Sequence, residues 1–554
     1  MARLFYIILS FLIVQNTVGQ YSKYIVQLKD KNGSAFSVND PSKYLSPRSI
    51  ARRQKQNIPI DITDLPIVSR YLDSIQSAGN VSILNVSKWL NQVCILTTDA
   101  LALNKINKFS FVINTQPLKK SLRSSEPVDK KEPIINNIGG NPKKELGNYY
   151  DYGNSFNQIH IHEGEFLHNQ GFHGEGMMIG IIDAGFFHYL SNRAFDSVRN
   201  QNRIIETYDF VNNKSTVNEE DAHGMNCFSI IACNLPGTLV GSCPNASFFL
   251  YKSEDVNSEY PVEEQNWVAA AERADSAGVD VLSTSLGYTT FDNSIFDHTY
   301  QQMNGRSTII ARANEMAARK GIISIVAAGN EGNTSWHYIS TPADADSILA
   351  VGAVNINGVP ATFSSYGFSA DGRIKPDVAS VGVGTAIAGP AGTGIYGNGT
   401  SYAAPNIAGL TTCLWQAFPE FTNIEIIDAI KKSSSIYNMP DNRIGYGIPN
   451  YHIAFTILLS QRAQRNNLVN ENLRVYPSPF SNNLEIAIKP NTSGKATISL
   501  FDASGKLCFF KQYDVTVGEL FKVSLQNLPV LNRGLYTLKY YDGKNTQSKK
   551  IMRL

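Results

Sequence analysis

The stretch Gly399-Thr400-Ser401-Tyr402-Ala403-Ala404-Pro405 is a glycine-rich turn that leads into an apolar segment, and we predict a buried helix from Ser401 to Phe418. Ser401 falls in the first turn of this helix. A serine hydroxyl becomes a good nucleophile only when a neighbouring base takes its proton. The start of a helix offers unpaired N–H groups and the positive end of the helix dipole. Ser401 is therefore a candidate nucleophile, although helix capping explains Thr400 and Ser401 equally well when they are considered alone.

Two other stretches supply an acid and a base. The apolar run from Met177 to Ile182 ends in Asp183, a pattern typical of a buried parallel strand that delivers a carboxylate to the carboxyl edge of a sheet. His223 opens a segment whose continuation, residues 228–233, is predicted as a helix. Taken singly, the aspartate is more often a turn residue and the histidine a cap or a core residue. Together with Ser401 they form an acid, a base and a nucleophile in the order Asp, His, Ser.

Four short motifs make the pattern specific: Asp183-Ala184-Gly185, His223-Gly224, Ala328-Gly329-Asn330 and Gly399-Thr400-Ser401-x-Ala403-x-Pro405. They resemble the four signature motifs of the subtilisin-like serine peptidases, and they occur in that family's order. The resemblance covers roughly residues 148–455 and also includes Ser285-Leu286-Gly287, Phe363-Ser364-Ser365-x-Gly367 and Ile374-Lys375-Pro376-Asp377.

The resemblance implies a role for each motif residue. Ser401 would attack the scissile carbonyl, His223 would take its proton, and Asp183 would orient the imidazole. Asn330 would donate to the oxyanion beside the backbone N–H of Ser401. The backbone of Ser285-Leu286-Gly287 would pair with an extended substrate, which implies that the substrates are polypeptides.

The chain departs from the family pattern at two positions. Ala184 and Met225 stand where the family usually has threonine, and neither position bears a reacting atom. We therefore expect altered packing near the triad and no loss of chemistry. No cofactor is expected. No metal site is expected either, because His162-Glu163 followed by His168 lacks the four-residue histidine spacing of the zinc-peptidase helix. The other histidines of this region, His160 and His173, are interpreted with them as surface or core residues.

Composition and periodicity indicate several globular domains. The chain has 554 residues, 43% of them hydrophobic and 17% charged, and its net charge of +2 gives no reason to expect nucleic acid as a partner. Between residues 148 and 460, short apolar strands alternate with helical apolar stripes. This pattern predicts an α/β domain with a subtilisin-like parallel sheet and helices on both faces.

The N-terminal part is predicted to contain a signal peptide, a propeptide and a linker. Residues 1–19 have a basic start, an apolar run and a small-residue end, which is typical of a secretory signal peptide. Residues 20–118 alternate strands and polar helices, and their position resembles that of a subtilisin propeptide with an α+β fold. Residues 119–147 are interpreted as a linker that contains the maturation cleavage site. Arg52-Arg53 could be a processing site, but paired basic residues on a helix are more often solvated surface.

Residues 461–554 show period-two alternation with turn residues between the runs, which predicts a small β-sandwich. This tail resembles the C-terminal sorting domains of type IX secretion in Val475-Tyr476-Pro477-Ser478-Pro479, Phe501-Asp502-x-x-Gly505-Lys506, Gly534-x-Tyr536 and the final residues 549–554. The resemblance implies that the secretion machinery is a partner. It also implies export through the periplasm to the cell surface or the medium, with no transmembrane segment after signal cleavage. A plain carbohydrate-binding or protein-binding module is the alternative.

Six cysteines lie at positions 94, 227, 233, 243, 413 and 508. Export would permit disulfides, and a bond between Cys233 and Cys243 would close a short loop. Cys227 and Cys413 could equally be small buried hydrophobic residues.

We therefore predict a secreted serine endopeptidase made as a zymogen. The alternative is a catalytically silent surface-binding protein that keeps the subtilisin fold. A lipase-type hydrolase is disfavoured, because Ala403 stands where a nucleophile elbow needs glycine and because the order of the triad differs.

Overall fold

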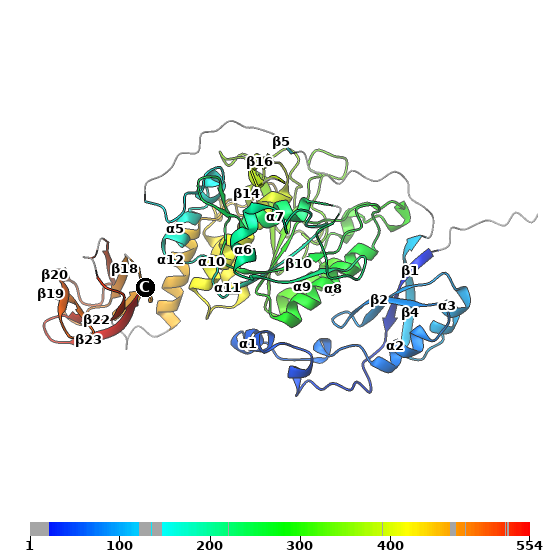
Figure 1. Ribbon diagram of the computed structural model, residues 1–554, viewed down its shortest axis with the longest axis horizontal. Helices are drawn as coiled ribbons and strands as arrows, with labels where there is room; N and C mark the ends of the chain where they lie inside the picture. Colours follow the sequence, from blue (N-terminus) through cyan, green and yellow to red (C-terminus); the bar gives the residue numbers. More distant parts are fainter. Residues whose placement is uncertain are drawn as a thin grey trace, which may run out of the picture.

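The computed structural model describes residues 21–120, 134–135, 147–465 and 473–554, except 220, 391, 482, 527, 529 and 530. The proposed signal peptide and most of the proposed linker lie outside these residues. Figure 1 shows an N-terminal domain (blue) and a C-terminal domain (orange and red) at opposite ends of a larger central domain.

The central domain is built on a seven-stranded sheet in the order β14-β13-β12-β11-β6-β10-β7. Every pair of neighbouring strands in this sheet is parallel. The strands are β6 (Met178–Asp183), β7 (Ile204–Asp209), β10 (Ser247–Lys252), β11 (Val281–Thr284), β12 (Ile323–Ala327), β13 (Leu349–Val354) and β14 (Val378–Val381). The predicted parallel sheet is thus confirmed.

Helices cover both faces of this sheet. Successive residues of a strand point to opposite faces, so Ile181 joins one core cluster while Ile182 joins another. The first cluster holds residues of α7 (His223–Ala232), α10 (Thr400–Ala417), α11 (Asn423–Lys432) and α12 (Tyr451–Arg465). The second holds residues of α8 (Val262–Ala277) and α9 (Ile309–Arg319). Shorter helices are α4 (Phe156–His160), α5 (Gly164–Asn169) and α6 (Asp196–Asn200). The continuous apolar strands follow from burial on both faces.

A small three-stranded sheet lies ahead of α10, in the order β15-β16-β5, and all its pairs are antiparallel. Its strands are β15 (Thr385–Ala388), β16 (Gly394–Gly397) and β5 (Ile134–Ile135). A two-stranded pair, β8 (Asn234–Leu235) and β9 (Leu239–Val240), follows α7.

The N-terminal domain is an antiparallel sheet in the order β2-β3-β1-β4 with two helices. Its elements are β1 (Tyr21–Leu28), α2 (Ser69–Gln76), β2 (Ser82–Ser87), β3 (Gln92–Leu96), α3 (Ala100–Ile106) and β4 (Val112–Lys120). A further helix, α1 (Pro47–Lys55), begins after Ser46, whose side chain accepts a hydrogen bond from the backbone N–H of Ser49. Both the α+β architecture and this capped helix were expected from the sequence.

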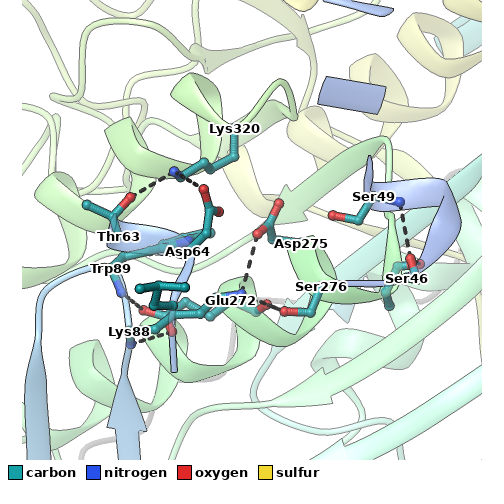
Figure 2. Close-up of polar contacts among 12 residues, drawn as sticks. Ser46, Ser49, Thr63, Asp64, Lys88, Trp89, Glu272, Asp275, Ser276 and Lys320 are labelled. Atoms are coloured by element: carbon teal, nitrogen blue, oxygen red, sulfur yellow. Dashed lines mark hydrogen bonds and ion pairs between the residues drawn. The ribbon is translucent and has the colours of Figure 1, made fainter. Parts of the chain in front are cut away.

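The helix α1 lies against the central domain, and both interpretations of Arg52-Arg53 are wrong. Their side chains are 4% and 1% exposed, because both guanidinium groups pair with the buried Asp275 carboxylate of α8. Arg53 also pairs with Asp64 at 2.9 Å, and Asp64 in turn pairs with Lys320 at 2.9 Å. Figure 2 shows Asp64, Asp275 and Lys320 within this polar interface. The pair is therefore neither an accessible processing site nor a solvated surface.

The N-terminal sheet makes a second polar contact with α8. Glu272 accepts hydrogen bonds from the backbone N–H groups of Lys88 and Trp89, at 2.8 and 3.0 Å (Figure 2). It also accepts one from the Ser87 hydroxyl at 2.5 Å. The Trp89 side chain is 5% exposed and belongs to the same core cluster as the α8 residue Trp267. The N-terminal domain thus contacts the central domain through both buried hydrogen bonds and a shared apolar core cluster.

The C-terminal domain consists of two antiparallel sheets that share one core. One sheet has the order β17-β18-β21 and the other the order β20-β19-β22-β23. The strands are β17 (Leu473–Tyr476), β18 (Leu484–Ile488), β19 (Gly494–Asp502), β20 (Leu507–Val515), β21 (Phe521–Leu525), β22 (Gly534–Tyr541) and β23 (Thr546–Arg553). Ile486 and Val523 of the first sheet pack in one cluster with Ile498 and Leu538 of the second. This arrangement is the predicted β-sandwich. Over the described part of the chain, no helix combines the length and the apolar character needed to cross a membrane.

Candidate active site

Asp183 and His223 meet at the carboxyl edge of the central sheet. Asp183 is the last residue of β6, and His223 is the first residue of α7. The Asp183 Oδ1 atom lies 2.6 Å from His223 Nδ1, and it also accepts a hydrogen bond from the Ala184 backbone N–H at 2.8 Å. Gly224 makes the close approach possible, since a Cβ there would lie 2.8 Å from Asp183 Cβ and 2.5 Å from the Gly185 carbonyl oxygen. The residue after His223 must therefore be glycine, because any side chain there would collide with Asp183 and Gly185.

Ser401 lies in the first turn of α10, as predicted, and its carbonyl group is held from outside the helix. Proline has no N–H, so Pro405 cannot donate the usual helical bond to the carbonyl four residues earlier. The Ser401 carbonyl oxygen instead accepts hydrogen bonds from Ser285 Oγ at 2.9 Å and from Cys227 Sγ at 3.4 Å. The Ser401 Oγ atom donates to the Ser285 carbonyl oxygen at 3.3 Å. Because Pro405 leaves the Ser401 carbonyl without its helical donor, this carbonyl can bind Ser285 and Cys227, which hold Ser401 in place.

Cys227 links the histidine to the serine. It lies one helical turn after His223 on α7, and its Sγ atom is 4.0 Å from His223 Nδ1. The same sulfur contacts the Ser401 carbonyl, and the ring of Tyr402, the next residue, lies 5.8 Å from the His223 ring. The structure therefore pairs Asp183 with His223 and places both beside the first turn of α10, while the Ser401 hydroxyl itself is bonded to the Ser285 carbonyl oxygen. From the sequence, Cys227 was left open between a disulfide partner and a small buried hydrophobic residue, although its spacing of four from His223 places both residues on one helix face.

Asn330 lies just after β12 and is oriented by Thr400. Its Oδ1 atom accepts hydrogen bonds from the Thr400 backbone N–H at 2.9 Å and from the Thr400 hydroxyl at 3.0 Å. A backbone N–H can only donate, so the contacting side-chain atom must be the oxygen. The amide nitrogen is consequently turned away from Thr400. The position next to the first turn of α10 agrees with the expected oxyanion donor.

The segment Ser285-Leu286-Gly287 follows β11 and is anchored at both ends. Ser285 is bonded to Ser401 through two hydrogen bonds that run in opposite directions. At the other end, Tyr288 and Thr341 form an antiparallel bridge. Gly287 packs tightly, because a Cβ there would lie 2.1 Å from Ser340 Oγ. The expected substrate-pairing segment thus begins in direct contact with the candidate nucleophile.

Residues 174–447 match the profile of the "Subtilase family". The chain carries a serine peptidase domain of this family. Residues 23–133 match the "Peptidase S8 propeptide domain, Bacteroidota", and residues 474–553 match the "Secretion system C-terminal sorting domain". The resemblances inferred for the central domain, the N-terminal domain and the tail are therefore confirmed.

Similar proteins include subtilisin DY of Bacillus licheniformis, which is 29% identical over 289 residues that cover 51% of this chain and 93% of that protein. Subtilisin E of Bacillus subtilis is 30% identical over 275 residues, which cover 49% of this chain and 63% of that protein. The solved structure of MycP1 from the ESX-1 type VII secretion system covers 58% of this chain and 91% of that chain, at 20% identity and a TM-score of 0.42. The prenylagaramide maturation protease PagA gives 19% identity and a TM-score of 0.43, over 53% of this chain and 98% of that chain.

The pKa values of two groups beside Ser401, His223 and Cys227, are shifted by their surroundings. Burial by itself lowers the pKa of His223, but the neighbouring Asp183 carboxylate outweighs burial and raises that pKa well above 6.5. Burial raises the pKa of the Cys227 thiol to about 12. Cys227 is therefore a neutral hydrogen-bond donor to Ser401, not a competing nucleophile.

The histidines near the start of the subtilase domain are structural. His162 is buried, with Nδ1 2.8 Å from the Pro449 carbonyl oxygen and Nε2 2.8 Å from Ser380 Oγ. His168 is also buried, and its two ring nitrogens contact the Tyr152 hydroxyl and the Ser242 carbonyl oxygen. Both residues thus fit the interpretation as satisfied core histidines.

The loop disulfide considered for Cys233 and Cys243 is not formed in this structure. The two buried thiols donate to different carbonyl oxygens, Cys233 to Leu239 at 3.2 Å and Cys243 to His173 at 3.5 Å.

Proposed function

We propose that this protein is a secreted serine endopeptidase, made as a zymogen, that hydrolyses peptide bonds through Asp183, His223 and Ser401. The observation that carries the proposal is the 2.6 Å contact between Asp183 and His223, placed beside Ser401 at the edge of the sheet. A catalytically silent protein would have no need to keep a fully buried acid against this histidine, because burying an ionisable pair is costly.

In the proposed reaction, Ser401 Oγ attacks the scissile carbonyl while His223 takes its proton, and Asp183 stabilises the resulting imidazolium. The tetrahedral oxyanion receives hydrogen bonds from the Asn330 amide and the Ser401 backbone N–H. His223 then gives its proton to the leaving amine, which leaves an acyl group on Ser401. Water then attacks the acyl carbonyl while His223 takes its proton. His223 returns that proton to Ser401 Oγ, and the carboxylic acid is released. Ser285-Leu286-Gly287 would hold the acyl side of the polypeptide substrate as an added strand.

Covalent labelling tests this function directly. We expect the mature protein to take up one equivalent of a fluorophosphonate, recovered by mass spectrometry on the peptide that contains Ser401. Heat-unfolded protein is the control, since an isolated serine hydroxyl is a poor nucleophile. Absence of labelling, or labelling spread over several serines, would favour the silent binding protein.

The raised pKa of His223 predicts the pH dependence. His223 must be neutral to accept a proton, so activity is lost as the pH falls through its pKa. Because this pKa lies above 6.5, we expect the acid limb of kcat/KM for a short peptide substrate to have its midpoint above pH 6.5. Circular dichroism over the same range would show that the enzyme stays folded. A midpoint at or below pH 6.5 would mean that Asp183 does not raise the pKa of His223 above its ordinary value.

The sorting domain implies secretion or cell-surface export, and we propose that it directs the chain across an outer membrane through the periplasm. Its buried core forms a cluster of its own, and Tyr476 of β17 packs against the core of the subtilase domain from outside, so its removal should leave the peptidase folded. We expect a chain that ends before residue 470 to accumulate in the periplasm, measured by fractionation and immunoblotting. Export of the shortened chain at the level of the full chain would show that the tail serves another purpose, such as carbohydrate binding.

A further inference from the structure

The C-terminal ends of α8 and α9 form the surface on which α1 and its cap lie (Figure 2). Each of these two helices leads into the strand that follows it, β11 or β12, so both helix ends lie at the amino edge of the parallel sheet. The last carbonyl groups of a helix have no partner within the helix, and the helix dipole makes this end negative. The surface therefore favours a cation that carries many hydrogen-bond donors.

Arg52 of α1 uses all three nitrogens of its guanidinium group on this surface. Its Nε atom donates to the Lys320 carbonyl oxygen at 3.2 Å, Nη1 donates to the Val279 carbonyl oxygen, and Nη2 donates to Asp275 Oδ1 at 2.5 Å. These acceptors belong to the ends of two different helices. A lysine offers all its donors from one nitrogen, so it cannot bind acceptors that are spread in this way. The surface thus fits arginine better than lysine.

The cations that pair with Asp275 come from the N-terminal domain. In the described part of the chain, its carboxylate forms ion pairs with Arg52, Arg53 and Lys88. The proposed maturation removes all three together with the propeptide. The subtilase domain then keeps an acid and a set of outward-facing carbonyl groups, which can bind the guanidinium groups of another polypeptide.

This surface is separate from the catalytic residues. Asp280 connects it to the start of β6, because its Oδ2 atom accepts hydrogen bonds from the Met178 backbone N–H at 2.9 Å and from Arg48 at 2.5 Å. Asp183 is the last residue of the same six-residue strand. At the usual rise of a strand, the two ends of β6 lie about 16 Å apart. A ligand on this surface therefore leaves the carboxyl edge of the sheet open to substrate.

Two glycines allow a helix to come close to both helix ends. A Cβ on Gly278 would lie 2.7 Å from Arg48 Cβ, and a Cβ on Gly321 would lie 2.7 Å from Gln56 Nε2. Both glycines have positive φ, which is common after the end of a helix and explains glycine there on its own. The absence of their side chains also leaves room for the backbone of a bound helix.

We propose that in the mature enzyme this surface is an exosite, a binding site outside the catalytic cleft, for basic helices of polypeptide substrates. The helix that fits carries arginines at the spacing of Arg48, Arg52 and Arg53, as α1 does in the zymogen. The inference rests on the proposed peptidase function and adds a class of substrate to it. Binding at this site holds the substrate near the enzyme and does not take part in the reaction.

The binding is tested with the mature form of Ser401→Ala and a fluorescent synthetic peptide of residues 41–58, which includes the Ser46 cap. We expect saturable binding that is at least tenfold tighter than binding of the matched peptide with Arg52→Lys and Arg53→Lys, which has the same charge. Asp275→Asn in the enzyme should lower the affinity for the arginine peptide to that for the lysine peptide. Equal affinities of the two peptides, or no binding at about 1 mM, would overturn the proposal.

Kinetics test whether the site recruits substrates. We compare two substrates in which a glycine-serine linker of about 20 residues, which spans roughly 25 Å, joins a cleavable peptide to the arginine or the lysine sequence. The arginine substrate should have a KM at least tenfold lower at equal kcat, because a remote contact stabilises the ground state and the transition state equally. Free arginine peptide should abolish this difference. It should not inhibit cleavage of a short substrate, and inhibition would place it in the catalytic cleft and overturn the proposal.

Labelling separates this inference from the proposed function. If the mature wild-type enzyme takes up no fluorophosphonate at Ser401, the peptidase function itself fails. If Ser401 is labelled but the two linked substrates have equal KM values, only the exosite is refuted.

Discussion

Replacing Ser401 with alanine is expected to leave the chain folded, uncut and almost inactive. Among the described residues, the side chain of Ser401 makes a single hydrogen bond, of 3.3 Å to Ser285, whereas the bonds from Ser285 Oγ and Cys227 Sγ are accepted by the Ser401 carbonyl group. The variant therefore keeps the contacts that hold the site together. Without the hydroxyl no acyl-enzyme can form. We expect kcat to fall about 10⁶-fold, a magnitude taken over from subtilisin, a relative, rather than from the present geometry.

The measurement has two parts, kcat of the mature form on a peptide substrate and the mass of the chain after expression. The mature form of Ser401→Ala is obtained by cleavage with added wild-type enzyme. Ser324→Ala is the matched control, since Ser324 is a buried serine of β12 whose hydroxyl has no hydrogen-bond partner among the described residues. It should mature normally and retain kcat. A Ser401→Ala chain that still cuts itself in isolation would place the nucleophile elsewhere.

The candidate site could be predicted from the sequence because its residues lie in short motifs. Asp183 ends the strand β6, and Ser401 lies in the first turn of the helix α10. Local patterns of apolar residues and glycine set both positions. The roles of Cys227 and Pro405 could not be predicted in the same way. They depend on the Ser401 carbonyl, which becomes available only because proline removes a helical donor and because α7 packs beside α10. Such a contact is a property of packing between segments, not of either segment alone.

The same distinction explains why both sequence-based interpretations of Arg52-Arg53 were wrong. The sequence predicts α1 with its cap and its basic residues, and a basic helix is normally exposed. The acid that buries Arg52 and Arg53 is Asp275, which lies 222 residues beyond Arg53 in the sequence. No local pattern links these positions. The parallel sheet was predictable because each strand, being buried on both faces, has its own continuous apolar run in the sequence.

Asp275→Ala is expected to weaken the docking of the propeptide by about 3–5 kcal/mol, the range found when one partner of a buried ion pair is removed. Asp275 is fully buried and is the shared counterion of Arg52 and Arg53. Burial by itself raises the pKa of Asp275, but the two arginines outweigh burial and lower it. Without the carboxylate, two guanidinium groups remain side by side in a buried interface. Arg53 keeps Asp64, whereas Arg52 keeps only hydrogen bonds to carbonyl groups such as that of Lys320.

The effect should be specific to the zymogen, because the proposed maturation removes both arginines together with the propeptide. Urea unfolding in the uncut Ser401→Ala background should show a lower midpoint for Asp275→Ala, while the mature form of Asp275→Ala should unfold as the mature parent does. Arg48→Ala is the matched control at the same interface. Its ion pair with Asp280 is 36% exposed on the arginine side, so its loss should cost only about 1 kcal/mol. Equal midpoints for Asp275→Ala and the uncut parent would mean that the apolar contacts around Trp89 hold the propeptide without help from the ions. A loss of the same size in the mature enzyme would mean that Asp275 supports α8 itself and not the docking of the propeptide.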